Sequence, residues 1–242
     1  MKAPASYTAA QTILAATLAG LISWACLRDK ATREALPPTA EVTQQTALEK
    51  LMAGNDRFTR MQVIHPDESL PRLKAVAQEQ HPFAVVVCCS DSRVPPELVF
   101  DQGLGNLFVV RTAGNIIGGV ETGSIEYAVE HLGARLVVVM GHENCGAVKA
   151  FVAGGTAPGH IRDIVDSLKK EQEIRQVGIR DEHRLESCVQ ANIVHGVHTL
   201  LAQSDIIREK VEQGGLQLVP ARYDLDNGQV TLLQPAEVLA GR

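Results

Sequence analysis

Aromatic residues and basic clusters are both scarce in this chain. Aromatic side chains make up 4% of its 242 residues, so the core must be built from Val, Leu, Ile and Ala. The net charge is −5 and no stripe of Lys and Arg is present, which argues against nucleic acid as a partner. With 45% apolar residues, the composition is that of a soluble globular protein, long enough for one large domain plus appendages.

The N-terminal segment lacks charge between Ala3 and Leu27, and residues 12–25 form a continuous run of apolar and small side chains. A lysine precedes this run and charged residues follow it, a pattern that predicts a secretory signal peptide over residues 1–25. The protein would then be periplasmic or secreted. Three alternatives stay open: an uncleaved membrane anchor over about residues 8–27, a lipoprotein modified at Cys26, and retention in the cytoplasm. Contact with a membrane is expected only through this segment.

The five cysteines do not form a disulfide framework. Cys88 and Cys89 are adjacent and could bridge only with strain, and Cys188 has no evident partner. For an exported protein this is a high thiol content, which is easier to understand if a metal ion holds two of the thiols as thiolates.

Beyond the leader, residues 26–40 are predicted to be a linker and residues 41–242 a single α/β catalytic domain. Short β-branched runs typical of strands buried on both faces alternate with segments of helical spacing. The predicted strands are residues 83–88, 107–110, 136–140, 216–220 and 229–233, and the predicted helices are residues 41–60, 116–132, 184–203 and 205–212. This alternation predicts a central, mostly parallel β-sheet flanked by helices, with an N-terminal helical arm.

Two short segments carry groups that can bind a metal ion. They are Val87-Cys-Cys-Ser-Asp-Ser-Arg-Val94 and Met140-Gly-His-Glu-Asn-Cys-Gly-Ala147. Cys89, His142 and Cys145 would supply two thiolates and one imidazole, and three protein ligands are typical of catalytic zinc sites that keep a fourth position open. A structural site would normally close with a fourth Cys or His, which neither segment supplies. Each segment follows a predicted strand, so neighbouring strands would bring them together at one edge of the sheet.

In an extended segment successive side chains point to opposite sides, so the adjacent Cys88 and Cys89 are expected to point in different directions. Cys89 and Asp91 can lean to the same side, whereas Cys88 would point away as a small core residue, so we predict Cys89 as the ligand. Asp91 is a hydrogen-bond acceptor when ionised, and Arg93 can hold it ionised and oriented through paired N–H donors.

The two segments resemble the signature segments of the β-class carbonic anhydrases. Four further segments match that family in order, and the resemblance covers about residues 55–235. These are Phe108-Val-Val-Arg-Thr-Ala-Gly-Asn115, Ser124-Ile-Glu-Tyr-Ala-Val129, Pro158-Gly-His-Ile161, which is similar to the exported bacterial branch, and Tyr223-Asp-Leu-Asp-Asn-Gly228.

The resemblance implies a β-carbonic anhydrase-like fold and the zinc-dependent, reversible hydration of carbon dioxide to bicarbonate and a proton. Zinc-bound hydroxide would attack carbon dioxide, oriented by a dyad of Asp91 and Arg93. Position by position, the resemblance implies zinc ligands at Cys89, His142 and Cys145, a carbon dioxide pocket lined by Gln80, Phe108 and Tyr127, and a backbone N–H at Gly146 for the substrate. The pocket residues typically meet across a subunit boundary, so a homodimer, or a tetramer containing such dimers, is implied.

Two positions depart from the family pattern. Glu143 stands where a small or hydroxyl residue is more usual, and we do not expect it to reach the metal. Val86 replaces the tryptophan of a subgroup that has an inhibitory bicarbonate site, so we do not expect that regulation and predict that Asp91 pairs with Arg93 at neutral pH.

Two rival functions remain at this point. The same scaffold could hydrolyse carbon disulfide or carbonyl sulfide, which a direct assay would distinguish. A structural zinc or redox-sensing module using Cys88 and Cys89 would need a fourth protein ligand or a thiol with free solvent access. His195 and His198 have a spacing that could bind metal, but no third ligand accompanies them in the sequence.

Overall fold

The computed structural model of the chain describes residues 44–234. The predicted signal peptide or anchor (residues 1–25) and the predicted linker (residues 26–40) therefore lie outside the described residues. Within the described residues, no helix is both long enough and apolar enough to cross a membrane.

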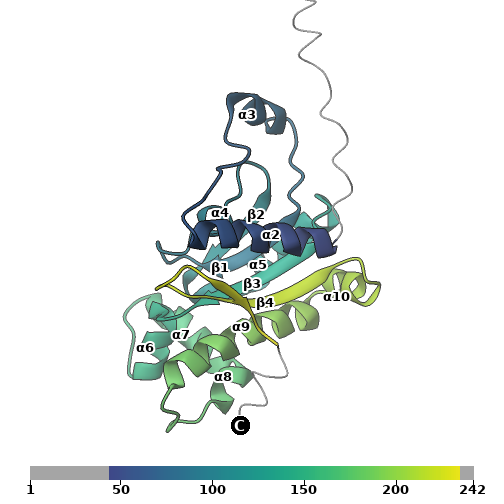
Figure 1. The fold of residues 1–242 in the computed structure, drawn as a ribbon. Helices are drawn as coiled ribbons and strands as arrows, with labels where there is room; N and C mark the ends of the chain where they lie inside the picture. The colour runs from purple at the N-terminus through teal and green to yellow at the C-terminus, as the bar shows by residue number, and fades with distance from the viewer. Residues whose placement is uncertain (1–43, 235–242) are drawn as a thin grey trace, which may run out of the picture. The chain divides into compact units, whose positions relative to one another are not determined.

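A single five-stranded sheet, in the order β2-β1-β3-β4-β5, runs through the described residues (Figure 1). Strands β2, β1, β3 and β4 are mutually parallel, and β5 pairs with β4 in the antiparallel direction, which confirms the predicted mostly parallel sheet. The strands are β1 (Ala84–Cys89), β2 (Leu107–Thr112), β3 (Leu136–His142), β4 (Gln217–Tyr223) and β5 (Val230–Leu232).

Strands β1 and β3 are buried at every position, as their valine-rich sequences predict for the centre of a sheet covered on both faces. Successive side chains of β1 enter different halves of the core. Val85, Val87 and Cys89 join one apolar cluster, and Val86 and Cys88 join the other.

Helices cover both faces of the sheet (Figure 1). Residues of α2 (Gln44–Thr59) and α4 (Pro96–Val99) pack in the cluster on one face. The cluster on the other face contains residues of α5 (Gly119–Glu130), α6 (Gly146–Ala153), α7 (Ile161–Lys170), α8 (Gln172–Gln176), α9 (Arg184–Gln203) and α10 (Asp205–Glu212). The remaining elements are the short helix α3 (Leu70–Val76) and the 3-10 turn η1 (Ala113–Asn115).

The four predicted helices are confirmed. Helices α9 and α10 have the predicted bounds, whereas the helix predicted over residues 116–132 is shorter, running from Gly119 to Glu130 as α5. The helix predicted over residues 41–60 is α2, whose described part begins at Gln44. Helices α4, α6, α7 and α8 were not predicted.

The order of the strands places a topological switch point between the carboxyl ends of β1 and β3. Strand β2 lies on one side of β1 and β3 on the other, so the two connections that follow β1 and β3 turn in opposite directions from it. Such a switch point is where parallel sheets bind their ligands. Cys89 ends β1 and His142 ends β3, so both predicted segments reach this edge.

Candidate metal centre

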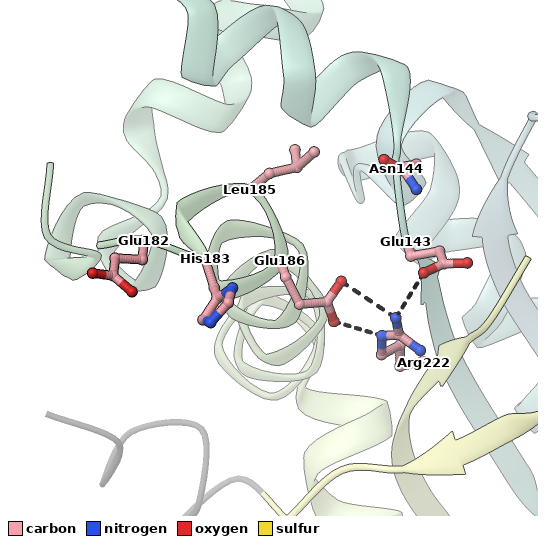
Figure 2. A pocket seen from close by; sticks show the side chains of 7 residues that line it. All are labelled: Glu143, Asn144, Glu182, His183, Leu185, Glu186 and Arg222. Carbon is pink, nitrogen blue, oxygen red and sulfur yellow. Dashed lines mark hydrogen bonds and ion pairs between the residues drawn. The ribbon is translucent and has the colours of Figure 1, made fainter. Parts of the chain in front are cut away.

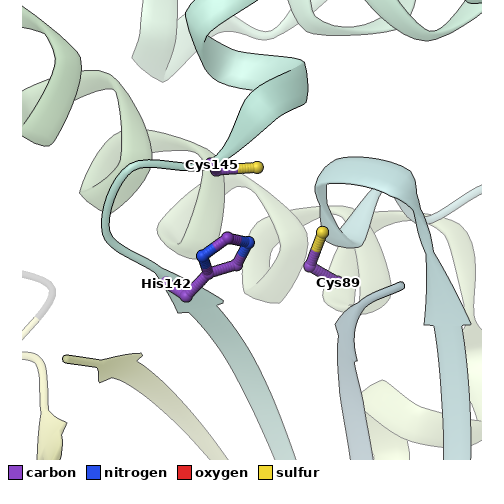
Figure 3. A group of neighbouring side chains, drawn as sticks. All are labelled: Cys89, His142 and Cys145. Atoms are coloured by element: carbon purple, nitrogen blue, oxygen red, sulfur yellow. The ribbon is translucent and has the colours of Figure 1, made fainter. Parts of the chain in front are cut away.

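The three predicted metal ligands converge at the carboxyl edge of the sheet (Figure 3). Cys89 is the last residue of β1, His142 is the last residue of β3, and Cys145 is the N-cap of α6. One ligand atom from each lies within 4.8 Å of the other two. The three residues are 5%, 0% and 1% exposed, respectively.

The hydrogen bonds of His142 leave one of its ring nitrogens available to a metal ion. Nδ1 lies 2.8 Å from the backbone oxygen of Glu143. Because that carbonyl can only accept, Nδ1 carries the hydrogen and Nε2 carries the lone pair. Nε2 is buried, has no hydrogen-bond partner among the described residues, and faces the two sulfur atoms (Figure 3).

The two sulfur atoms lie close together, and each shifts the pKa of the other in the opposite direction. The Cys145 thiol, together with His142 and the N–H of Gly114 at 3.3 Å, lowers the pKa of Cys89 against the opposing effect of burial. The same contact raises the pKa of Cys145. A divalent cation binds cysteine side chains as thiolates and displaces their protons. Two sulfurs and one imidazole nitrogen, buried and convergent, are a donor set that fits Zn²⁺.

Asp91 and Arg93 form a two-pronged ion pair beside the three ligands. Arg93 donates from Nη2 to Oδ2 of Asp91 at 2.7 Å and from Nε to Oδ1 at 2.9 Å, and its backbone N–H reaches Oδ1 at 3.0 Å. Oδ2 also lies 3.8 Å from Nε2 of His142. The hydrogen bond from Arg93 holds the pKa of Asp91 far below its ordinary value, so this carboxylate is ionised throughout the neutral range.

Comparison with known proteins gives the family of the chain. The family model described as carbonic anhydrase matches residues 84–230, which contain the three ligands and the Asp91–Arg93 pair. The chain belongs to the carbonic anhydrase family. It is 41% identical over 202 residues to carbonic anhydrase 2 of Mycobacterium tuberculosis, a match that covers 81% of this chain and 95% of that protein.

Solved structures place the fold in the β class of this family. The β-carbonic anhydrase CcaA aligns with a TM-score of 0.64 at 27% identity, covering 78% of this chain and 89% of that chain. A tetrameric β-carbonic anhydrase from Sordaria macrospora aligns with a TM-score of 0.61 at 25% identity, covering 77% of this chain and 96% of that chain. The general reaction of carbonic anhydrases is the reversible hydration of carbon dioxide.

Cys88 does not take part in this site. It lies on the opposite face of β1 and is fully buried, and burial raises the pKa of its thiol to about 12. All four cysteines in the described part of the chain are buried, and the metal-binding group around Cys89 has three members there. A redox-sensing module at Cys88 and Cys89 would need an exposed thiol, and a structural zinc site there would need a fourth protein ligand. The described residues supply neither.

Three of the predicted substrate residues lie away from the metal centre of their own chain. Phe108 pairs with Val85 near the start of β1, four residues from the Cys89 end, or roughly 13 Å along the strand. The Tyr127 ring lies 6.5 Å from that of Phe108 and Tyr127 is 48% exposed. Gln80 is exposed and precedes β1, at the edge opposite Cys89. Gly146, in contrast, begins α6 directly after Cys145.

Sequence reasoning missed the residues that hold the backbone of the site. Arg111 donates to the carbonyl oxygens of Cys89, at 3.0 and 3.1 Å, and of Asp91, at 2.7 Å. Asn192 donates to the carbonyl oxygen of Gly114 at 2.8 Å, and thereby fixes the turn whose N–H reaches Cys89. Arg111 and Gly114 lie in the matched segment Phe108–Asn115, which was the available signal. No short-range pattern pointed to Asn192.

The pair His195 and His198 does have a third group in space. Glu173 of α8 accepts from Nδ1 of His195 and from Nδ1 of His198, each at 2.6 Å. Both imidazoles therefore present the same nitrogen to one carboxylate, and the cluster connects α8 to α9. The sequence concealed this partner because it lies 22 residues from His195 and in a helix that was not predicted.

Proposed function

We propose that the chain binds one Zn²⁺ ion through Cys89, His142 and Cys145 and catalyses the reversible hydration of carbon dioxide to bicarbonate and a proton. The observation that carries this proposal is the convergence of three buried donors beside an ionised Asp91 held by Arg93. Membership of the carbonic anhydrase family supports it independently.

Zinc bound there would supply Lewis acidity, which makes water a nucleophile near neutral pH. Two thiolates give more charge to the metal than two imidazoles would, so we expect activity to rise toward alkaline pH. The side chains of the protein would orient the reacting water molecule. Asp91 can only accept a hydrogen bond, so a water molecule beside Oδ2 directs its hydrogen there and its lone pair elsewhere, toward the carbon of carbon dioxide.

Arg93 has two tasks in this scheme. Its paired donors keep Asp91 ionised, and they fix the plane of the carboxylate relative to Nε2 of His142. We propose that the backbone N–H of Gly146, the first residue of α6, donates to an oxygen of the substrate.

We also propose that a second copy of the chain completes the carbon dioxide pocket. Phe108 lies near the start of β2, away from the Cys89 end of β1, with the ring of Tyr127 in α5 beside it, and Gln80 precedes β1. We propose that these residues line the pocket at a metal centre of another chain. The exposed Tyr127 and the neighbouring Val120, which is 81% exposed, offer an apolar surface for this contact. A homodimer, or a tetramer containing such dimers, follows; the relative from Sordaria macrospora is tetrameric.

Zinc content and carbon dioxide hydration, measured on a chain that begins at Leu27, test the main proposal. We expect one zinc ion per chain and hydration activity that is lost when a chelator removes the metal. A protein that binds no zinc, or that holds zinc without hydrating carbon dioxide, would contradict it. Carbonyl sulfide and carbon disulfide, offered to the same preparation, separate the rival hydrolase activity.

Export remains a proposal that rests on residues 1–25 alone. We propose a periplasmic or secreted location, with a signal peptide removed before Cys26. The mass of the N-terminal peptide of the protein purified from cells, together with fractionation, tests it. Retention of the full segment in the membrane fraction would indicate an anchor, and a lipid on Cys26 would indicate a lipoprotein.

A further inference from the structure

The side chain of Glu143 binds to Arg222 at the end of β4 (Figure 2). Its Oε2 accepts from Nη2 of Arg222 at 3.1 Å, and its Oε1 accepts from the backbone N–H of Leu225 at 2.7 Å. The side chains of Glu143 and Arg222 are only 14% and 18% exposed, so water competes weakly for these bonds.

The main chain of Glu143 is bound to the same strand and also to the metal ligand. Its N–H donates to the carbonyl oxygen of Tyr223 at 3.2 Å, and its own carbonyl oxygen accepts from Nδ1 of His142 at 2.8 Å. Asn144, which follows, has the left-handed backbone angle φ of 55°. Three contacts to β4 and its loop therefore hold the peptide group whose oxygen fixes the imidazole of His142.

Arg222 is itself held firmly. Its guanidinium also binds Glu186 of α9 (Figure 2) and Asp224, so it contacts three carboxylates in all. Its single positive charge offsets part of the negative charge of Glu143 and Asp224, whose carboxylates lie close to that of Asp226. Because the three carboxylates bind its guanidinium, Arg222 keeps a defined orientation and can hold the side chain of Glu143 in place.

We propose that Glu143 is a positioning residue for the metal ion. Its carboxylate, bound by Arg222 and Leu225, sets the orientation of its own carbonyl group. That carbonyl holds His142 in the tautomer and ring orientation that present Nε2 to the two cysteine sulfurs. The inference rests on the proposed function, because it assumes that Cys89, His142 and Cys145 bind zinc.

Groups that orient a metal-binding histidine commonly change metal affinity by about 10–100-fold when they are removed. A residue that only stabilises the fold would act differently, because it would lower the stability of the metal-free and zinc-loaded proteins equally. It would leave the affinity for zinc unchanged. These two roles can therefore be separated by measurements that do not depend on catalysis.

The test uses the full chain with Glu143→Ala, Glu143→Gln and the control Glu182→Gln. Glu182 lines the same pocket, of about 410 Å³, but is exposed and lies away from Arg222 (Figure 2). The measurements are the rate of zinc loss to a chelator, the absorption spectrum of the Co²⁺-substituted protein, and thermal unfolding with and without metal.

We expect Glu143→Ala to lose zinc about 10–100-fold faster and to shift the Co²⁺ spectrum. Glu143→Gln, which keeps one neutral acceptor, should fall between it and the wild type and gives the result if the alanine variant fails to fold. Glu182→Gln should match the wild type. Equal losses of stability with unchanged zinc loss and spectra would overturn the inference and leave the proposed function intact. A wild-type chain that takes up neither metal would overturn both.

Discussion

The carboxylate of Asp91 is bound by the guanidinium of Arg93 through two hydrogen bonds of 2.7 and 2.9 Å, and its Oδ2 lies 3.8 Å from Nε2 of His142. Asp91 therefore has two competing partners, the arginine and any metal ion held by the three ligands. The two paired hydrogen bonds favour a carboxylate that stays on the arginine.

We predict that this arrangement persists when zinc is bound at neutral pH, which leaves the fourth metal position free for water. A crystal structure of the zinc-loaded protein at about pH 7 checks it. Asp91 should remain paired with Arg93, whereas an Asp91 oxygen at about 2.0–2.2 Å from zinc, the usual length of a zinc–carboxylate bond, would show that the carboxylate blocks the site. Family membership would stand in either case.

Replacing Cys145 by serine should remove zinc from the protein. Serine presents a hydroxyl that does not ionise near neutral pH, so two strong ligands would remain out of three. The matched control is Cys188→Ser, the same change at another buried cysteine, which lies in α9 and does not belong to the metal-binding group. Zinc content and carbon dioxide hydration should fall together in Cys145→Ser only. Full zinc and activity in that variant would mean that Cys145 is not a ligand.

The proposal of a shared pocket can be tested by mixing two inactive chains. Asp91→Asn should keep zinc, because three ligands remain, yet lose activity on the order of 100-fold, because an amide cannot replace the ionised acceptor. Gln80→Ala should damage the pocket. If Gln80 serves the metal centre of the partner, a mixed dimer contains one intact site, and an equal mixture recovers about a quarter of wild-type activity, given random pairing in a symmetric dimer.

Co-refolding of the two variants, followed by the hydration assay, supplies the measurement. Each variant refolded alone provides the control for its residual activity. If Gln80 and Asp91 serve the same chain, every site of the mixed dimer carries one defect. The mixture would then show no recovery, and the shared pocket would be refuted. Dilution that separates the subunits should likewise abolish activity per chain.

The features that could be predicted from sequence are those determined by residues close to one another in the chain. Strands β1 and β3 are valine-rich and buried on both faces, and the period of α9 is clear over 20 residues. The metal ligands follow from their position after two such strands. Cys88 was correctly separated from Cys89, because alternation along a strand needs no knowledge of the partner strand.

The parts that could not be predicted depend on contacts between distant segments. Helix α8 has five residues, and its Glu173 is bound by His195 and His198 of α9, so its stability depends on packing rather than on its own sequence. The bond between Glu143 and Arg222 joins residues 79 apart. The sequence led us not to expect Glu143 at the metal, but it could not show what the carboxylate of Glu143 binds.

A buried carboxyl group outside the metal centre has a consequence for stability. Glu171, between α7 and α8, is 3% exposed, and its Oε2 has no hydrogen-bond partner among the described residues. Burial, and secondarily the charge of Glu173, raises the pKa of Glu171 from 4.5 to about 9. Between these two values the folded chain keeps a proton that the unfolded chain releases. The free energy of unfolding therefore falls as the pH rises from about 4.5 to about 9.

Glu171→Gln removes this titration while keeping the size of the side chain. We expect the stability of the variant relative to the wild type to rise between about pH 6 and about pH 9, by on the order of 4 kcal/mol. Urea unfolding of both zinc-loaded proteins at the two pH values gives the measurement. The pH dependence of zinc binding is common to both proteins and cancels in their difference. The exposed Glu182→Gln should show no such trend. A difference between Glu171→Gln and wild type that is the same at both pH values would mean that Glu171 titrates normally in the folded protein.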